Sequence, residues 1–392
     1  MIKIPSTVGA ADAMMAQLPD EATDFSLDAT SMLSLPRFPI EEIARAQCLN
    51  SWISKVPISL GTVSYDGPGE ARDVLRMLGT SPLGLMLVAR RREWFPPEDF
   101  KRLKTIRADY FEQLHSWPDL ARRDSTFILC DDAYSKGLPS PLYDSAGSLR
   151  SDTYFEKFVP TLVESVMQAE SLRGEINTQS SLLTTLLYEL VKNTHDHALY
   201  TAEGEGIEDS VRLVLSRYYK LDDLDIPVPA KNAKEPLEPH IAFVKALKQK
   251  SNDSMRDKNK KTFRGILEFS VLDSGPGFVG SWLKRKIASD EDISVEYKAV
   301  LDCLRAGHST ARNPNRGLGL SDVLRALRAL DGFIRIRTNR ISVYRDFMLL
   351  RDDKREPVEE HLHDWKRGVS SKASIFGNMT GAAVSVLVPV EA

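Results

Sequence analysis

The segment GILEFSVLDSGPGF, residues 265–278, constrains the fold more than any other part of the chain. Residues 265–272 are mostly apolar and include β-branched side chains, which is typical of a buried strand. The glycines that follow predict a tight turn. Because Asp273 is the last residue of this strand, we expect its carboxylate to face a cleft beside the turn.

The sequence around this strand predicts an α/β pattern across residues 151–392. We expect a two-layer α/β sandwich in which a mixed sheet carries helices on one side. The segments between these elements at about 220–262 and 341–378 are less regular and are expected to be insertions. Helices are predicted at 152–176, 180–200, 281–305 and 321–330, and strands at 211–219, 265–273, 332–339 and 382–390.

Residues 1–150 predict a smaller α/β domain, with a boundary near residue 150 where long periodic segments begin. The segment DFSLDATSML, residues 24–33, resembles the start of STAS-type regulatory domains. No chemical motif stands out in this part of the chain, so its role stays open. Strands are predicted at 56–65, 84–91 and 125–132, and helices at 39–54 and 69–79.

Length and composition indicate a soluble globular protein. A chain of 392 residues is long enough for two or three domains, and 42% hydrophobic with 27% charged residues is the usual balance of such proteins. The net charge of −3 gives no field that would require nucleic acid or an anionic membrane as a partner. The sequence contains no signal peptide and no apolar run of spanning length, so we expect a cytoplasmic protein.

Cysteine and histidine patterns do not indicate a metal centre. Cys48, Cys130 and Cys303 are far apart in the sequence and are expected to be reduced core residues. His361 and His363 form an HxH pair, which could ligate a metal only with further ligands. We expect this pair to lie in a solvated charged segment instead.

Glycine patterns need context before they indicate a nucleotide site. Four Gly-x-Gly sequences occur, at 67/69, 204/206, 275/277 and 317/319, and a single one has little specificity. The pair at 275/277 differs from the others because it follows a buried strand ending in Asp273. The pair at 317/319, in RGLGL, leads directly into a predicted helix, whose free N–H groups favour phosphate oxygens.

A third element lies in the predicted helix containing ELVKNTHDHA, residues 189–198. Glu189 and Asn193 are four residues apart and therefore share one helix face. A carboxylate there can orient or deprotonate a water molecule, and an amide oxygen is a suitable ligand for Mg²⁺. The alternative is a helix that simply turns its polar residues toward solvent.

Taken together and in this order, ExxxN, DxGxG and GxGL resemble the GHKL superfamily of ATP-binding domains. This family includes type II topoisomerases, Hsp90-like chaperones, MutL-type repair proteins and sensor histidine kinases. The resemblance covers residues 152–392 and implies a Bergerat-type fold that binds ATP and Mg²⁺. It implies that Glu189 is the general base, that Asn193 coordinates Mg²⁺ and that Asp273 accepts a hydrogen bond from the adenine amine.

The resemblance also implies roles for the remaining motif residues. Gly275 and Gly277 would shape the adenine pocket, and residues 279–316 would take the position of the ATP lid. The family usually has Thr after the glycine of its third glycine box, whereas Gly381 here is followed by Ala382. Phosphate contacts are expected from the lid end and the second glycine box, at His308, Ser309, Thr310, Arg312, Arg316, Gly317, Leu318 and Gly319.

Two uses of ATP are compatible with these motifs. In the first, the protein is a slow ATPase that acts as a nucleotide-gated regulatory switch toward a protein partner or a second copy of itself. In the second, it is a protein kinase that phosphorylates His or Ser of a partner. His115 lacks the acidic neighbour of a histidine-kinase phosphoacceptor, and no later domain that could donate a Lys or Arg is expected. A degenerate scaffold is disfavoured because Glu189 and Asn193 are both present.

Overall fold

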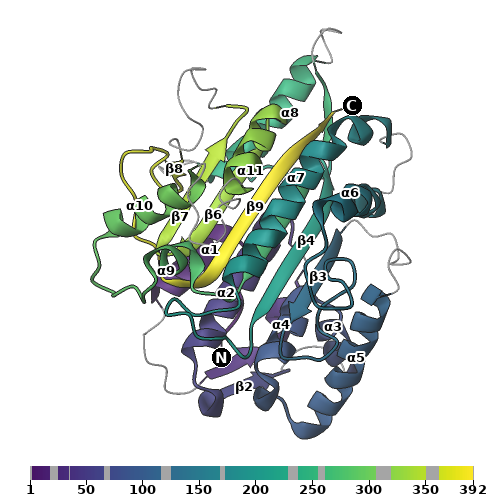
Figure 1. Ribbon diagram of the computed structural model, residues 1–392, viewed down its shortest axis with the longest axis vertical. Helices are drawn as coiled ribbons and strands as arrows, with labels where there is room; N and C mark the ends of the chain where they lie inside the picture. The colour runs from purple at the N-terminus through teal and green to yellow at the C-terminus, as the bar shows by residue number, and fades with distance from the viewer. Residues whose placement is uncertain are drawn as a thin grey trace.

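The computed structural model describes residues 2–17, 25–34, 36–65, 71–115, 125–167, 173–227, 237–254, 261–305, 319–349 and 362–391. Within these ranges, a seven-stranded sheet has the order β3-β4-β5-β9-β6-β7-β8 (Figure 1). Its strands are β3 (Ser125–Asp131), β4 (Val211–Lys220), β5 (Phe263–Asp273), β9 (Met379–Glu391), β6 (Phe333–Asn339), β7 (Ile341–Asp346) and β8 (His363–Asp364).

The prediction of a mixed sheet is wrong for this large sheet. Each strand in it pairs with its neighbours in the antiparallel direction. Parallel pairing occurs in a separate small sheet formed by β1 (Phe25–Asp28) and β2 (Gly61–Ser64). The predicted strands at 125–132, 211–219, 265–273, 332–339 and 382–390 are confirmed as β3, β4, β5, β6 and β9.

Helices cover both faces of the large sheet, which corrects the expectation of helices on one side. Along β9, Val384, Val386 and Val388 belong to one hydrophobic core, whereas Ala383 and Leu387 belong to another. This alternation with period two is expected of a strand buried on both faces. The first core includes α6 (Asp152–Met167), α7 (Arg173–His197) and α11 (Gly319–Ala329); the second includes α1 (Val8–Gln17), α2 (Glu41–Lys55), α4 (Pro82–Arg90) and α8 (Pro239–Ser254).

The amino-terminal part of the chain contributes directly to this architecture. Strand β3 precedes residue 150 and pairs along its whole length with β4, so the large sheet contains strands from both sides of the predicted boundary. Helix α2 packs against β9 and β5 on the face opposite α7. The same part of the chain includes α3 (Ala71–Leu78) and α5 (Pro97–His115), which ends at the exposed His115.

The strand predicted at 84–91 is wrong, because this segment forms α4. Its apolar residues are buried on all sides and therefore carry no periodicity that separates helix from strand. The deciding signals precede it: the Ser81 hydroxyl accepts a hydrogen bond from the Gly84 N–H, and Pro82 stands in the first turn. The strand predicted at 56–65 is shorter than expected, since residues 58–60 form a 3-10 turn before β2.

Both predicted insertions contain regular structure. The first contains α8, whose Phe243, Val244 and Leu247 are buried against the sheet. The second contains β7 and β8, which extend the sheet beyond β6. Between β5 and α11 lie α9 (Gly277–Leu283) and α10 (Ile293–Leu304). In the ranges given above, no helix is both long and apolar enough to cross a membrane.

Candidate functional site

Helix α7 and the start of α11 meet at Glu189. Gly319 is the first residue of α11, and a Cβ atom added to it would lie 2.4 Å from Oε2 of Glu189. A side chain at this position would displace the flexible end of Glu189. The carboxylate of Glu189 therefore lies beside the amino terminus of α11, where helix N–H groups favour negative charge. Asn193, one turn further along α7, is half-buried.

Charged neighbours surround the Glu189 carboxylate. Nζ of Lys192 lies 4.0 Å from Oε2 of Glu189 and 3.7 Å from Oδ2 of Asp196. Burial is the main cause that raises the pKa of Glu189 above its usual range, and Lys192 opposes it. The carboxylates of Asp322, Asp196 and Asp152 raise the pKa of Glu189 further. A raised pKa brings this group closer to the range in which a carboxylate is an effective general base.

Asp273 lies at the end of β5 and is 6% exposed. Its Oδ1 accepts hydrogen bonds from the N–H of Gly275 at 2.9 Å and from the N–H of Ala382 at 3.3 Å. Within the part of the chain that the structure describes, its Oδ2 has no hydrogen-bond partner. Burial raises the pKa of Asp273 to about 6, although the two N–H donors and Arg212 lower it. Among the described residues, the carboxylate is thus anchored through one of its two oxygens.

Glycines allow the backbone to pack closely around Asp273. Gly277 and Gly381 have φ angles of +72° and +74°, in the left-handed region that favours glycine. A Cβ on Gly381 would lie 1.8 Å from the carbonyl oxygen of Asp273, and a Cβ on Gly275 would lie 2.8 Å from Cα of Ala198. The glycine turns therefore pack against each other and against the carboxyl end of α7.

Thr338 provides a hydroxyl where Ala382 lacks one. It lies on β6 directly across from Ala382 in the antiparallel register. Its Oγ1 accepts a hydrogen bond from the N–H of Phe278 at 3.0 Å and lies 3.3 Å from the carbonyl oxygen of Gly381. Thr338 belongs to no motif in the sequence, because only the pairing of β6 with β9 brings it to the glycine turns.

The two groups of site residues lie toward opposite ends of the second half of α7. Glu189 and Gly319 form one group, and Asp273 with its glycines forms the other, next to His197 and Ala198. His197 is eight positions after Glu189, which is about 12 Å along a helix axis.

Several predicted residues lie outside the described residues. They are His308, Ser309, Thr310, Arg312, Arg316, Gly317, Leu318 and His361. His363 is described: its Nδ1 lies 3.0 Å from the carbonyl oxygen of Gly368, and its Nε2 lies 3.1 Å from Nη1 of Arg345. Among the residues with described positions, no cluster of three or more His, Cys, Asp or Glu could hold a metal ion.

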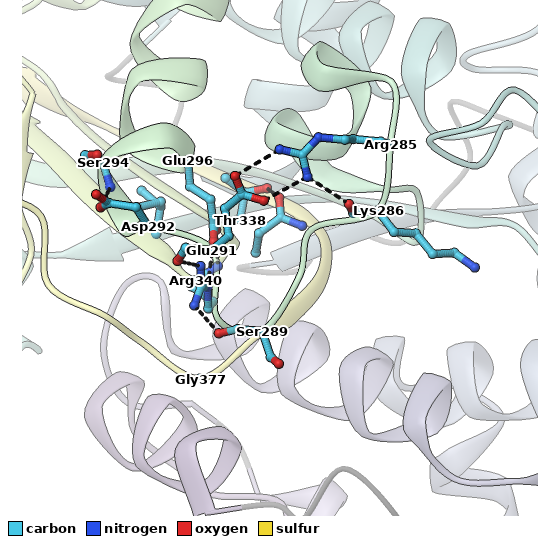
Figure 2. A network of polar contacts seen from close by, with 12 residues as sticks. Arg285, Lys286, Ser289, Glu291, Asp292, Ser294, Glu296, Thr338, Arg340 and Gly377 are labelled. Carbon is cyan, nitrogen blue, oxygen red and sulfur yellow. Dashed lines mark hydrogen bonds and ion pairs between the residues drawn. The ribbon is translucent and has the colours of Figure 1, made fainter.

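The described part of the predicted lid, residues 279–305, is anchored by Arg340. Nε of Arg340 donates to Oε1 of the fully buried Glu296 at 2.5 Å, and its backbone N–H donates to Oε2 at 3.1 Å. Its two Nη atoms donate to the carbonyl oxygens of Ser289 and Glu291, each at 2.6 Å. Figure 2 shows this network beside the exposed pair of Arg285 and Glu291. The turn between β6 and β7 thus holds the segment that connects α9 to α10.

The chain was compared with family models, curated proteins and solved structures. None of these comparisons found a match.

Proposed function

We propose that the protein binds ATP with Mg²⁺, hydrolyses it slowly and acts as a nucleotide-gated regulatory switch toward a protein partner or a second copy of the chain. The observation that carries this proposal is the state of Asp273, whose Oδ1 is held by two backbone N–H groups while Oδ2 faces no donor among the described residues. A buried carboxylate with one free oxygen is suited to accept a hydrogen bond from a planar base.

Adenine fits this acceptor because its exocyclic amine is a hydrogen-bond donor. Gly275 and Gly277 would shape this end of the pocket by letting the turn pack closely against Ala198 and Thr338. A buried site that hydrogen-bonds one group of its ligand discriminates strongly against analogues that lack the group. The proposal therefore assigns base selectivity to Asp273.

The opposite end of the site is suited to phosphate. The first-turn N–H groups of α11, which begins at Gly319, have no partner within the helix and lie at the positive end of its dipole. Asn193 would hold Mg²⁺, which keeps several of its waters and needs few protein ligands; the bound ion would neutralise charge on the phosphates. Glu189 would orient and deprotonate the attacking water, a role that its raised pKa supports.

Replacing Glu189 with alanine is expected to leave ATP binding intact and to slow phosphate release roughly 100-fold, the usual contribution of a general base. The substitution removes the base but leaves Asp273 unchanged. Binding is measured by calorimetric titration and turnover by release of inorganic phosphate. Glu164→Ala, an exposed position on α6, is the control and should leave both quantities unchanged. Normal turnover in Glu189→Ala would contradict the assignment.

The alternative function, a protein kinase, shares the same ATP site but transfers the phosphoryl group to a protein. The two are separated by incubating the protein with γ-labelled ATP, first alone and then with cell extract. Free phosphate as the only labelled product supports the ATPase switch. Label on any protein supports the kinase, and label on His115 would identify a phosphoacceptor within the chain.

A further inference from the structure

Helix α2 reaches the back of the proposed base site through Asn50. This residue is fully buried between α2 and the sheet. Its Nδ2 lies 3.5 Å from the carbonyl oxygen of Asp273 and 3.4 Å from the carbonyl oxygen of Thr380. A single side-chain amide thus bridges the end of β5 and the start of β9 from the face opposite α7.

The two segments bridged by Asn50 are the ones that hold the Asp273 carboxylate. On the α7 face, Oδ1 of Asp273 accepts hydrogen bonds from the N–H groups of Gly275 and Ala382. On the α2 face, Asn50 contacts the carbonyl groups of Asp273 and Thr380. The spacing of the two segments therefore depends on hydrogen bonds from both faces of the sheet.

Arg90 fixes the orientation of the Asn50 amide. Its Nη1 lies 2.5 Å from Oδ1 of Asn50, and its Nε lies 3.2 Å from Oδ2 of Asp209. Arginine offers donors only, so the amide oxygen must face Arg90 and the amide NH₂ must face the two carbonyl groups. Asp209 lies in the segment between α7 and β4.

We propose that Asn50 is a positioning residue for Asp273, which makes the amino-terminal part of the chain a component of the nucleotide site. The inference rests on the proposed function and deepens it. Asn50 touches no ligand: it fixes the distance between the turns that direct the Asp273 carboxylate toward the adenine amine. Loss of Asn50 should therefore weaken recognition of that amine more than it weakens binding of the rest of the nucleotide.

The test compares ATP with inosine triphosphate, which lacks the exocyclic amine, as calorimetric ligands for the full chain. In Asn50→Ala, we expect affinity for ATP to fall about tenfold, the equivalent of one well-placed hydrogen bond. Inosine triphosphate has no exocyclic amine to be misaligned, so its affinity should change less than threefold. Asn50→Asp keeps the acceptor for Arg90 but places an oxygen against two carbonyl oxygens, so it should show the same loss of preference for ATP.

Ser54→Ala is the matched control, because the Ser54 hydroxyl contacts Arg90 and the carbonyl oxygen of Asn50 but neither turn. It should keep the wild-type preference for ATP. A merely structural role for Asn50 predicts equal losses for both nucleotides, and that result, or rescue of the preference by Asn50→Asp, would overturn the inference. If Asn50→Ala does not fold, the affinities for the two nucleotides are compared in Asn50→Asp alone. A wild-type protein that fails to bind ATP would instead refute the proposed function and, with it, this inference.

Discussion

Replacing Asp273 with asparagine is expected to abolish ATP binding in a calorimetric titration, a loss of roughly 100-fold or more in affinity. The asparagine oxygen can still accept the N–H groups of Gly275 and Ala382, so the turns should keep their geometry. Its NH₂ group would then occupy the position of Oδ2 and would meet the adenine amine donor to donor. Unchanged affinity would refute the adenine assignment.

The same substitution is expected to stabilise the protein at neutral pH. Burial raises the pKa of Asp273 to about 6, so the folded state favours the neutral carboxyl group. The stabilising contribution of this group is complete below its unfolded-state pKa of about 4 and is lost as the pH rises through 6. At pH 8, ionisation of Asp273 costs on the order of 3 kcal/mol, which Asp273→Asn removes. Its stability gain, measured by urea unfolding, should therefore grow between pH 4 and pH 7.

Asp346 offers a matched control for both results. It is also buried, its Oδ1 accepts the N–H groups of Met348 and Leu349, and burial raises its pKa to about 6. Asp346 lies at the end of β7, separated from β5 by β6 and β9. Asp346→Asn should therefore give a similar gain in stability without loss of ATP binding. A parallel loss of binding in both variants would indicate a general effect of removing a buried charge.

The sequence predicted those parts of the fold that depend on local pattern. The apolar segments at 382–390 and before Asp273 both predicted strands that the structure contains. The segment at 84–91 was mispredicted because an apolar run without periodicity fits either structure, and only the Ser81 cap and Pro82 distinguish them. The short strand β8 has two residues, too few to leave any periodic signal.

Contacts between distant segments explain what the sequence missed at the candidate site. The sequence alone indicated one group of site residues, because they lie within five positions of each other at the end of a buried strand: Asp273, Gly275 and Gly277. Thr338 and Asn50 carry no motif: Thr338 reaches the site through the register of β6 with β9, and Asn50 through the packing of α2 on the opposite face of the sheet. Such positions follow from strand order and layer packing, which a single sequence does not specify.

Arg340→Ala is expected to lower the free energy of unfolding by about 3–5 kcal/mol, the largest loss among the substitutions proposed for this protein. The side chain of Glu296 is completely buried, and that of Arg340 is only 11% exposed. Removing the guanidinium leaves the Glu296 carboxylate without its charged partner, although the backbone N–H of residue 340 still donates to Oε2. It also leaves the carbonyl groups of Ser289 and Glu291 without these donors. Urea unfolding monitored by circular dichroism measures the change.

Arg285→Ala is the control for this prediction, because it removes an arginine from the same network on the protein surface (Figure 2). Arg285 pairs with Glu291 at 2.8 Å, but water screens this exposed pair, so its loss should leave the unfolding free energy nearly unchanged. Equal effects of the two substitutions would show that the buried pair does not stabilise the segment. If Arg340→Ala alone is destabilising, the turn between β6 and β7 is the anchor for residues 279–305. Nucleotide affinity should then fall in Arg340→Ala as well, because α9 begins at Gly277 in the glycine turn.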